Sequence, residues 1–111
     1  MQLRMRSQNL TISEEMRGSI ERRLRFVLGR FGSRIGRVTV LLGEPIGPHG
    51  TTGKRCRIVV RLLSSGRVSF EDTDPDLGAA VNRAIDRVGQ SVRRELERQH
   101  EAAVPIVHRG G

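Results

Sequence analysis

Residues 54–63 read KRCRIVVRLL, and the alternation of apolar and basic residues in this segment indicates how the chain folds. A period of two is typical of a β-strand that buries one of its faces. The predicted core face carries Cys56, Ile58, Val60 and Leu62, and the opposite face carries Arg55, Arg57, Val59 and Arg61. A strand with one apolar face needs a covering layer, which must come from the rest of the chain.

The flanking sequence predicts three further strands. Residues 2–6 and 37–42 alternate in the same way, and residues 67–71 return from a tight turn at residues 64–66. The segment 43–53 contains four glycines and two prolines. We expect it to be a flexible connection, long for a hairpin, and it lacks the ending of a phosphate-binding loop.

Two helices are predicted outside the central strands. The first begins after Ser13, a favourable N-terminal cap, and keeps apolar residues at helical spacing as far as about Phe31. The last runs from about Pro75 to Gln99. The order β-α-β-β-β-α predicts an α+β two-layer sandwich, with both helices packed on one face of a four-stranded, mostly antiparallel sheet. We expect one domain at residues 1–99 and a loose tail at residues 100–111.

Charge is the strongest compositional signal. The 111 residues include 20 Lys and Arg against 12 Asp and Glu, which gives a net charge of +8. Such an excess favours a polyanionic partner. Cys56 is the single cysteine, which suggests a reducing compartment, and neither a secretion signal nor an apolar run of membrane-spanning length is present. We therefore expect a cytoplasmic protein that does not bind membranes.

The arginines of the two helices are the candidate binding residues. On the last helix four of them fall within one narrow sector, interrupted by Gln90, and on the first helix the arginines lie opposite the apolar face. If the helices lie side by side, with Gly18, Ser19 and Gly29 allowing close approach, their outward faces would form one broad cationic surface. The predicted RNA-binding residues are Arg22, Arg23, Arg25, Arg30, Arg83, Arg87, Arg94 and Arg98.

The sequence offers no pattern for catalysis or metal binding. The three histidines are far apart, Cys56 faces the predicted core, and the acidic cluster at residues 71–76 is explained by helix capping. We therefore expect no catalytic residue, no metal, no cofactor and no small-molecule substrate. Phe31 and Phe70 lie on core faces, and Phe26 is expected at the boundary of the core, so base stacking has little support.

Several segments resemble one known family. Met1-Gln2-Leu3, the segment NLTISEEMR at residues 9–17, RFGSRI at residues 30–35 and DLGAAVNRAIDR at residues 76–87 are similar to the ribosome hibernation-promoting factors and ribosome-associated inhibitors, also called the sigma-54 modulation protein family. The resemblance covers about residues 1–99. It implies a small bacterial protein that binds the small ribosomal subunit, a role associated with stress and stationary phase.

In that family both helices present basic residues to ribosomal RNA, in the channel used by mRNA and the tRNA anticodon ends, so that translation stops and idle ribosomes are preserved. By position, Arg23, Arg30, Arg87, Arg94 and Arg98 fall in the family's basic stripe. Gln90 stands where a basic residue is common, and Gly89, Glu95 and Glu97 dilute the charge of the last helix. The chain resembles the short form, without a C-terminal dimerisation domain, and we expect a monomer.

Two other interpretations remain open at this stage. The chain could be a stand-alone double-stranded RNA-binding module, although Asp74 and Asp76 at the start of the last helix would repel phosphate. It could also be a protein-binding regulator of the same fold that no longer contacts ribosomes.

Overall fold

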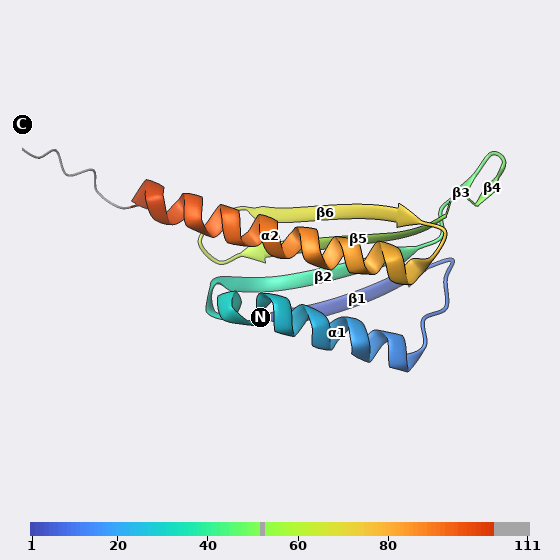
Figure 1. Ribbon diagram of the computed structural model, residues 1–111, viewed down its shortest axis with the longest axis horizontal. Coiled ribbons are helices and arrows are strands. Elements are labelled where there is room, and N and C mark those ends of the chain that lie inside the picture. Colours follow the sequence, from blue (N-terminus) through green and yellow to red (C-terminus); the bar gives the residue numbers. More distant parts are fainter. Residues whose placement is uncertain (52, 104–111) are drawn as a thin grey trace, which may run out of the picture.

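The computed structural model describes residues 1–51 and 53–103 and confirms the predicted two-layer architecture. A four-stranded sheet in the order β1-β2-β5-β6 forms one layer, and helices α1 and α2 lie side by side on one of its faces (Figure 1). Neither helix of the described residues lies on the second face of the sheet (Figure 1).

The sheet is built from β1 (Gln2–Gln8), β2 (Ile35–Gly43), β5 (Lys54–Leu62) and β6 (Arg67–Asp74). β1 pairs with β2 in parallel, whereas β2–β5 and β5–β6 are antiparallel, so the expectation of a mostly antiparallel sheet is confirmed. The parallel pairing is possible because α1 carries the chain back to the starting end of β1.

The segment 43–53 was expected to be a flexible connection, and this expectation is wrong in part. Ile46–Gly47 (β3) and Gly50–Thr51 (β4) form a small antiparallel ladder that projects beyond the sandwich (Figure 1). Gly50 has a φ of +101°, a conformation that glycine adopts without a steric penalty and that permits this tight reversal.

Helix α1 (Glu14–Leu28) starts where expected, because the Ser13 hydroxyl accepts a hydrogen bond from the Met16 amide at 3.1 Å. It ends earlier than Phe31, since Gly29–Arg34 continues as the 3₁₀ helix η1. Helix α2 spans Leu77–Ala103. Its cap is Asp76, whose carboxylate accepts a hydrogen bond from the Ala79 amide at 3.2 Å, so Pro75 precedes the helix instead of opening it.

The C-terminal boundary also differs. Residues 100–103 continue α2, although they were expected to belong to the tail, and the remainder of that tail, residues 104–111, lies outside the described residues.

The core lies between the helices and the sheet. Val38, Val40, Ile58, Val60 and Val88 are all fully buried, which places the alternating faces of β2 and β5 against the apolar side of α2 as predicted. Buried Cys56 belongs to the same cluster, and Phe31 and Phe70 pack against it. Both aromatic assignments to the core are therefore confirmed.

The two helices touch at Gly89 of α2. A Cβ atom at this position would lie 2.5 Å from Cγ1 of Val27 on α1, whereas at Gly29 it would meet nothing within 4 Å. The close approach of the helices therefore depends on Gly89, and the expectation that Gly29 serves this purpose is wrong.

Candidate nucleic-acid interface

The outer surface of α1 combines arginines with an exposed aromatic ring. Arg22, Phe26 and Arg30 follow one another at intervals of four residues, so they share one face of the helix and its 3₁₀ extension. Phe26 is 88% exposed, and its expected position at the core boundary is wrong. The helical spacing of the six apolar core positions places Phe26 on the far side of the helix, and this signal was available in the sequence.

A groove of about 220 Å³ lies along the contact between the two helices. On one side Arg23 of α1 donates a hydrogen bond of 2.5 Å to the side-chain oxygen of Asn82 on α2. Further along, the groove is lined by Arg30, Asp86, Gln90 and Arg93, among others. Arg93, which sequence reasoning did not select, lies 4.0 Å from Glu97 and adds a cation to this groove.

Two arginines of α2, Arg83 and Arg87, contact residues of β6. The Arg83 guanidinium donates hydrogen bonds of 2.6 Å to Asp72 and 2.7 Å to Asp74, two residues at the end of β6. These charge-assisted bonds hold the pKa of both carboxyl groups below the usual value and raise the pKa of Arg83. Arg87 lies over the ring of Phe70, with its guanidinium carbon 5.9 Å from the ring centre.

The structure therefore divides the eight predicted residues by their partners. Arg25 pairs with Glu21, Arg83 with Asp72 and Asp74, and Arg98 with Glu95. Hydrogen bonding from Arg98 also lowers the pKa of Glu95. Within residues 1–51 and 53–103, the recorded ion pairs do not include the other five predicted residues: Arg22, Arg23, Arg30, Arg87 and Arg94.

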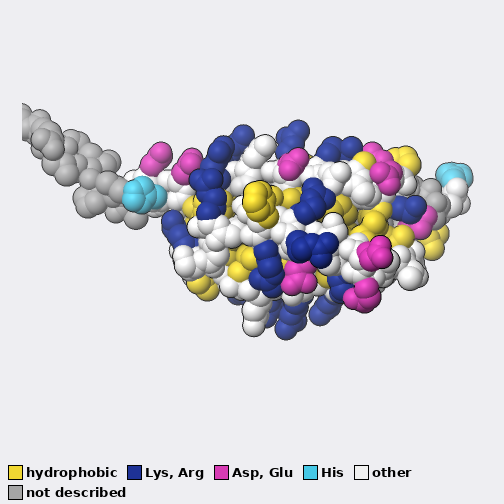
Figure 2. Space-filling model, turned by 60° about the horizontal axis from the view of Figure 1, so that its bottom comes forward, with side chains coloured by type: hydrophobic (Ala, Val, Ile, Leu, Met, Phe, Trp, Pro, Cys, Tyr) yellow, Lys and Arg dark blue, Asp and Glu magenta, His cyan; other side chains and the backbone are white. Residues whose placement is uncertain are grey.

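The sequence predicted one continuous cationic surface across the two helices, and this prediction is wrong. Asp86 and Gln90 separate the arginines of α1 from the stripe on α2. Figure 2, in which the α1 side of the molecule comes forward, shows Lys and Arg side chains in separate groups with carboxylates between them. The helix side offers two rows of cations with a mixed strip between them.

The chemistry of the described residues does not indicate a reaction centre. Burial raises the pKa of the Cys56 thiol to about 12, so the reactive thiolate is almost absent at neutral pH. No group of three or more His, Cys, Asp or Glu residues suited to a metal ion occurs among residues 1–51 and 53–103. Within the same described part of the chain, no helix is long and apolar enough to cross a membrane.

Comparison with known proteins gives a family and a fold. The family model described as sigma 54 modulation protein / S30EA ribosomal protein matches residues 3–100. The structure of the Protein Y N-terminal domain from Thermus thermophilus superimposes with a TM-score of 0.68 at 29% identity, covering 85% of this chain and 98% of that one. A ribosomal subunit interface protein from Coxiella burnetii superimposes with a TM-score of 0.71 at 15% identity, covering 87% and 99%, and shows the fold alone. A search of curated protein sequences finds no match.

Proposed function

The chain belongs to the sigma 54 modulation protein / S30EA ribosomal protein family, and from this membership we propose that it binds the small ribosomal subunit and inhibits translation. The observation that carries the proposal is the match of the family model over residues 3–100, nearly the whole described domain. The Coxiella burnetii protein of the same fold is named for the interface between ribosomal subunits, which agrees with this role.

The proposed RNA contacts are the five predicted arginines that take no part in the ion pairs recorded within residues 1–51 and 53–103: Arg22, Arg23, Arg30, Arg87 and Arg94. A guanidinium group presents planar, paired donors that match phosphate oxygens, and a cation without a carboxylate partner has no ion pair to break when it binds one. Arg25, Arg83 and Arg98 would each have to exchange a carboxylate for a phosphate, so we expect them to contribute little.

The proposed action is steric and not catalytic. The protein would occupy the channel in which mRNA and the anticodon ends of tRNA lie, and idle cytoplasmic ribosomes would be held inactive, as in stationary phase. Because the contacts are mainly to phosphates, ribosomal RNA is recognised by its shape and charge more than by its sequence.

Phe26 adds a contact of a different kind. Its ring is exposed between Arg22 and Arg30, and an aromatic ring flanked by cations is the arrangement on which an unpaired base stacks while its phosphates are neutralised. We include stacking on Phe26 in the proposal as the contact made by α1 with an unpaired nucleotide.

Binding to purified small ribosomal subunits tests the proposal. If about six phosphates are engaged, the affinity should fall by roughly a thousandfold between 50 and 200 mM salt. The variant R87Q/R94Q should lower the salt slope by about 1.5, because each lost contact removes roughly 0.7–0.9. The control R25Q/R98Q loses the same charge from ion-paired positions and should bind as the wild type does. Equal binding by both variants would count against the helix arginines.

The two alternative functions give different results in the same assay. A stand-alone double-stranded RNA-binding module would bind naked duplex RNA as tightly as it binds subunits. A protein-binding regulator that has left the ribosome would bind neither. The Asp76 cap and the engagement of Arg83 by Asp72 and Asp74 leave the start of α2 without a free cation among the described residues, which disfavours the duplex RNA module.

A further inference from the structure

The face of the sheet that carries no helix is strongly cationic. By strand alternation and register it displays seven arginines and one carboxylate, Glu71; the arginines are Arg4, Arg6, Arg37, Arg55, Arg57, Arg61 and Arg67. Glu71 lies 3.6 Å from Arg55, toward the end of the sheet where β6 finishes. The opposite end of this face therefore has a concentration of positive charge.

Three of these arginines form a row across adjacent strands. Arg37 of β2 is opposite Arg61 of β5, and Arg61 is opposite Arg67 of β6. Neighbouring strands are about 4.8 Å apart, so the three guanidinium groups extend from one small area. Glu71 follows Arg67 by four residues along β6, which is about 13 Å in an extended strand. Among residues 1–51 and 53–103, none of the recorded ion pairs involves Arg37, Arg61 or Arg67.

This arrangement opposes folding when no anion is bound. Like charges directly opposite each other on a sheet repel, and each such pair is destabilising. Ordinary surfaces intersperse the two signs of charge, as the helix side of this molecule does. An arrangement of residues that destabilises the fold is expected at a functional site, where a bound ligand supplies the compensating charge.

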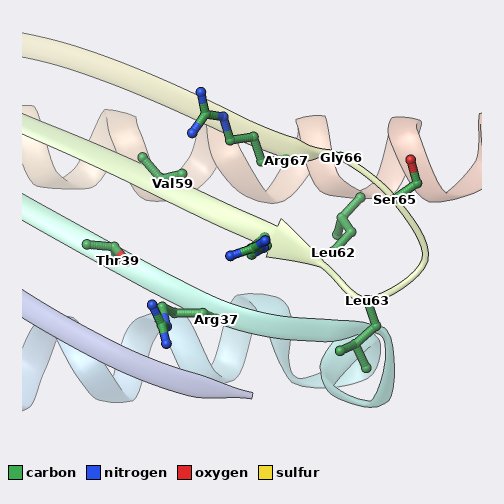
Figure 3. A pocket seen from close by; sticks show the side chains of 9 residues that line it. Arg37, Thr39, Val59, Leu62, Leu63, Ser65, Gly66 and Arg67 are labelled. Atoms are coloured by element: carbon green, nitrogen blue, oxygen red, sulfur yellow. The ribbon is translucent and has the colours of Figure 1, made fainter.

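The row also lies in a hollow of about 630 Å³. Figure 3 shows Arg37, Thr39, Val59 and Arg67 on the face of the sheet that is turned away from the helices, which lie behind it. Arg61 and the turn residues Leu63, Ser65 and Gly66 complete the wall. The hollow thus combines three cations with the hydroxyl groups of Thr39 and Ser65, all of which donate hydrogen bonds to phosphate oxygens.

The rim of the hollow is held in place from the other layer. Gln99 of α2 accepts a hydrogen bond of 2.5 Å from the Ser64 hydroxyl and donates one of 3.1 Å to the Ser65 carbonyl. The Leu63 amide donates to the Arg34 carbonyl at 2.9 Å. The turn that carries Ser65 is therefore held in position beside the arginine row before any ligand arrives.

We propose that the hollow around Arg37, Arg61 and Arg67 binds backbone phosphates of a second RNA segment, so that the protein is held between RNA on its helix side and RNA on its open sheet face. RNA fits better than an acidic protein segment because the site offers three guanidinium groups, each with paired donors, and two hydroxyls, and the apolar residues in its lining, Val59, Leu62 and Leu63, are aliphatic. This inference rests on the proposed function for the source of the RNA, which is the ribosome.

The test uses the variant R61Q/R67Q, since both side chains are exposed and their removal relieves repulsion. R25Q/R98Q serves again as the control with equal loss of charge. Affinity is measured for purified small subunits and for a fluorescent 20-nucleotide RNA over a series of salt concentrations. We expect R61Q/R67Q to melt no lower than the wild type and to bind subunits roughly tenfold or more weakly at 0.1 M salt, with a salt slope smaller by about 1.5.

The outcomes separate this inference from the proposed function. In the first outcome the wild type binds subunits, R87Q/R94Q weakens that binding, and R61Q/R67Q behaves as the control. The sheet face is then not an RNA site, and this inference is overturned while the proposed function stands. If R61Q/R67Q loses subunit affinity but binds the free RNA as the wild type does, the face contacts a ribosomal protein, which also overturns it. If the wild type binds only the free RNA and R61Q/R67Q loses that binding, the phosphate site is supported and the ribosomal role fails.

Discussion

Replacing Gly89 with alanine would place a methyl group at the point where the two helices meet. The added Cβ would lie 2.5 Å from Cγ1 of Val27, whereas ordinary contacts between such carbons begin near 3.4 Å. The overlap is therefore close to an ångström. Val27 cannot easily turn away, because a β-branched side chain in a helix has one strongly preferred rotamer.

Two opposing effects set the magnitude. Overpacking of a well-filled contact costs about 1–3 kcal/mol, and alanine is better than glycine inside a helix by about 1 kcal/mol. Because both helices are also fixed against the sheet, we expect the packing cost to prevail by about 1 kcal/mol. For a domain of this size such a loss lowers the melting temperature by roughly 4–8 °C.

Thermal and urea denaturation of three variants checks this reasoning. Gly29→Ala is the matched control: its added methyl group meets nothing within 4 Å and its φ is −58°, so it should be neutral or stabilise the protein by up to about 1 kcal/mol. Combining Val27→Ala with Gly89→Ala removes the overlapping atom, and in that background the second substitution should no longer destabilise. If Gly89→Ala is as stable as Gly29→Ala, the helices are not held at the distance described above.

Three further results are expected. The pKa values of Asp72 and Asp74 lie below the unfolded value of about 3.9, so these carboxylates stabilise the folded protein fully above about pH 4, and the stabilisation is lost as the pH falls through the lowered values. Urea titrations at pH 6 and pH 3 should show a smaller loss of stability for Arg83→Gln than for the wild type. An equal loss in both proteins would contradict the pairing of Arg83 with the two carboxylates. The pKa of Cys56 is raised to about 12, so a thiol reagent at pH 8 should modify the protein only at the rate at which it unfolds, and rapid labelling of the folded protein would argue against burial of the thiol. Phe26→Ala should leave the melting temperature unchanged, since Phe26 is 88% exposed. The same variant should weaken binding to single-stranded RNA by about 1–3 kcal/mol, and unchanged affinity would exclude the ring as a stacking contact.

Local patterns in the sequence determine most of the fold. The alternation at Cys56, Ile58 and Val60 identified the buried face of the central strand, and Ser13 identified the start of the first helix. The end of that helix was predicted less well, because a 3₁₀ turn continues the apolar spacing to Phe31 without i to i+4 hydrogen bonding.

Features that depend on contacts between distant segments could not be predicted in this way. The pairing of Arg83 with Asp72 and Asp74 requires α2 to lie over the end of β6, and the row formed by Arg37 and Arg61 requires the strand register. Alternation alone placed Arg61 on the outer face of its strand, but a strand sequence does not specify its neighbours.

The parallel pairing of β1 with β2 has a consequence for the order in which the protein loses structure. Gln2 pairs with Arg37 across the whole of α1, whereas β5 and β6 are joined by a turn of four residues. Closing the longer loop costs more entropy, and β1 has a hydrogen-bonded neighbour on one side only. In deuterated water the amides of β1 should exchange before those of β5, so the N-terminal strand is the first part of the sheet to open.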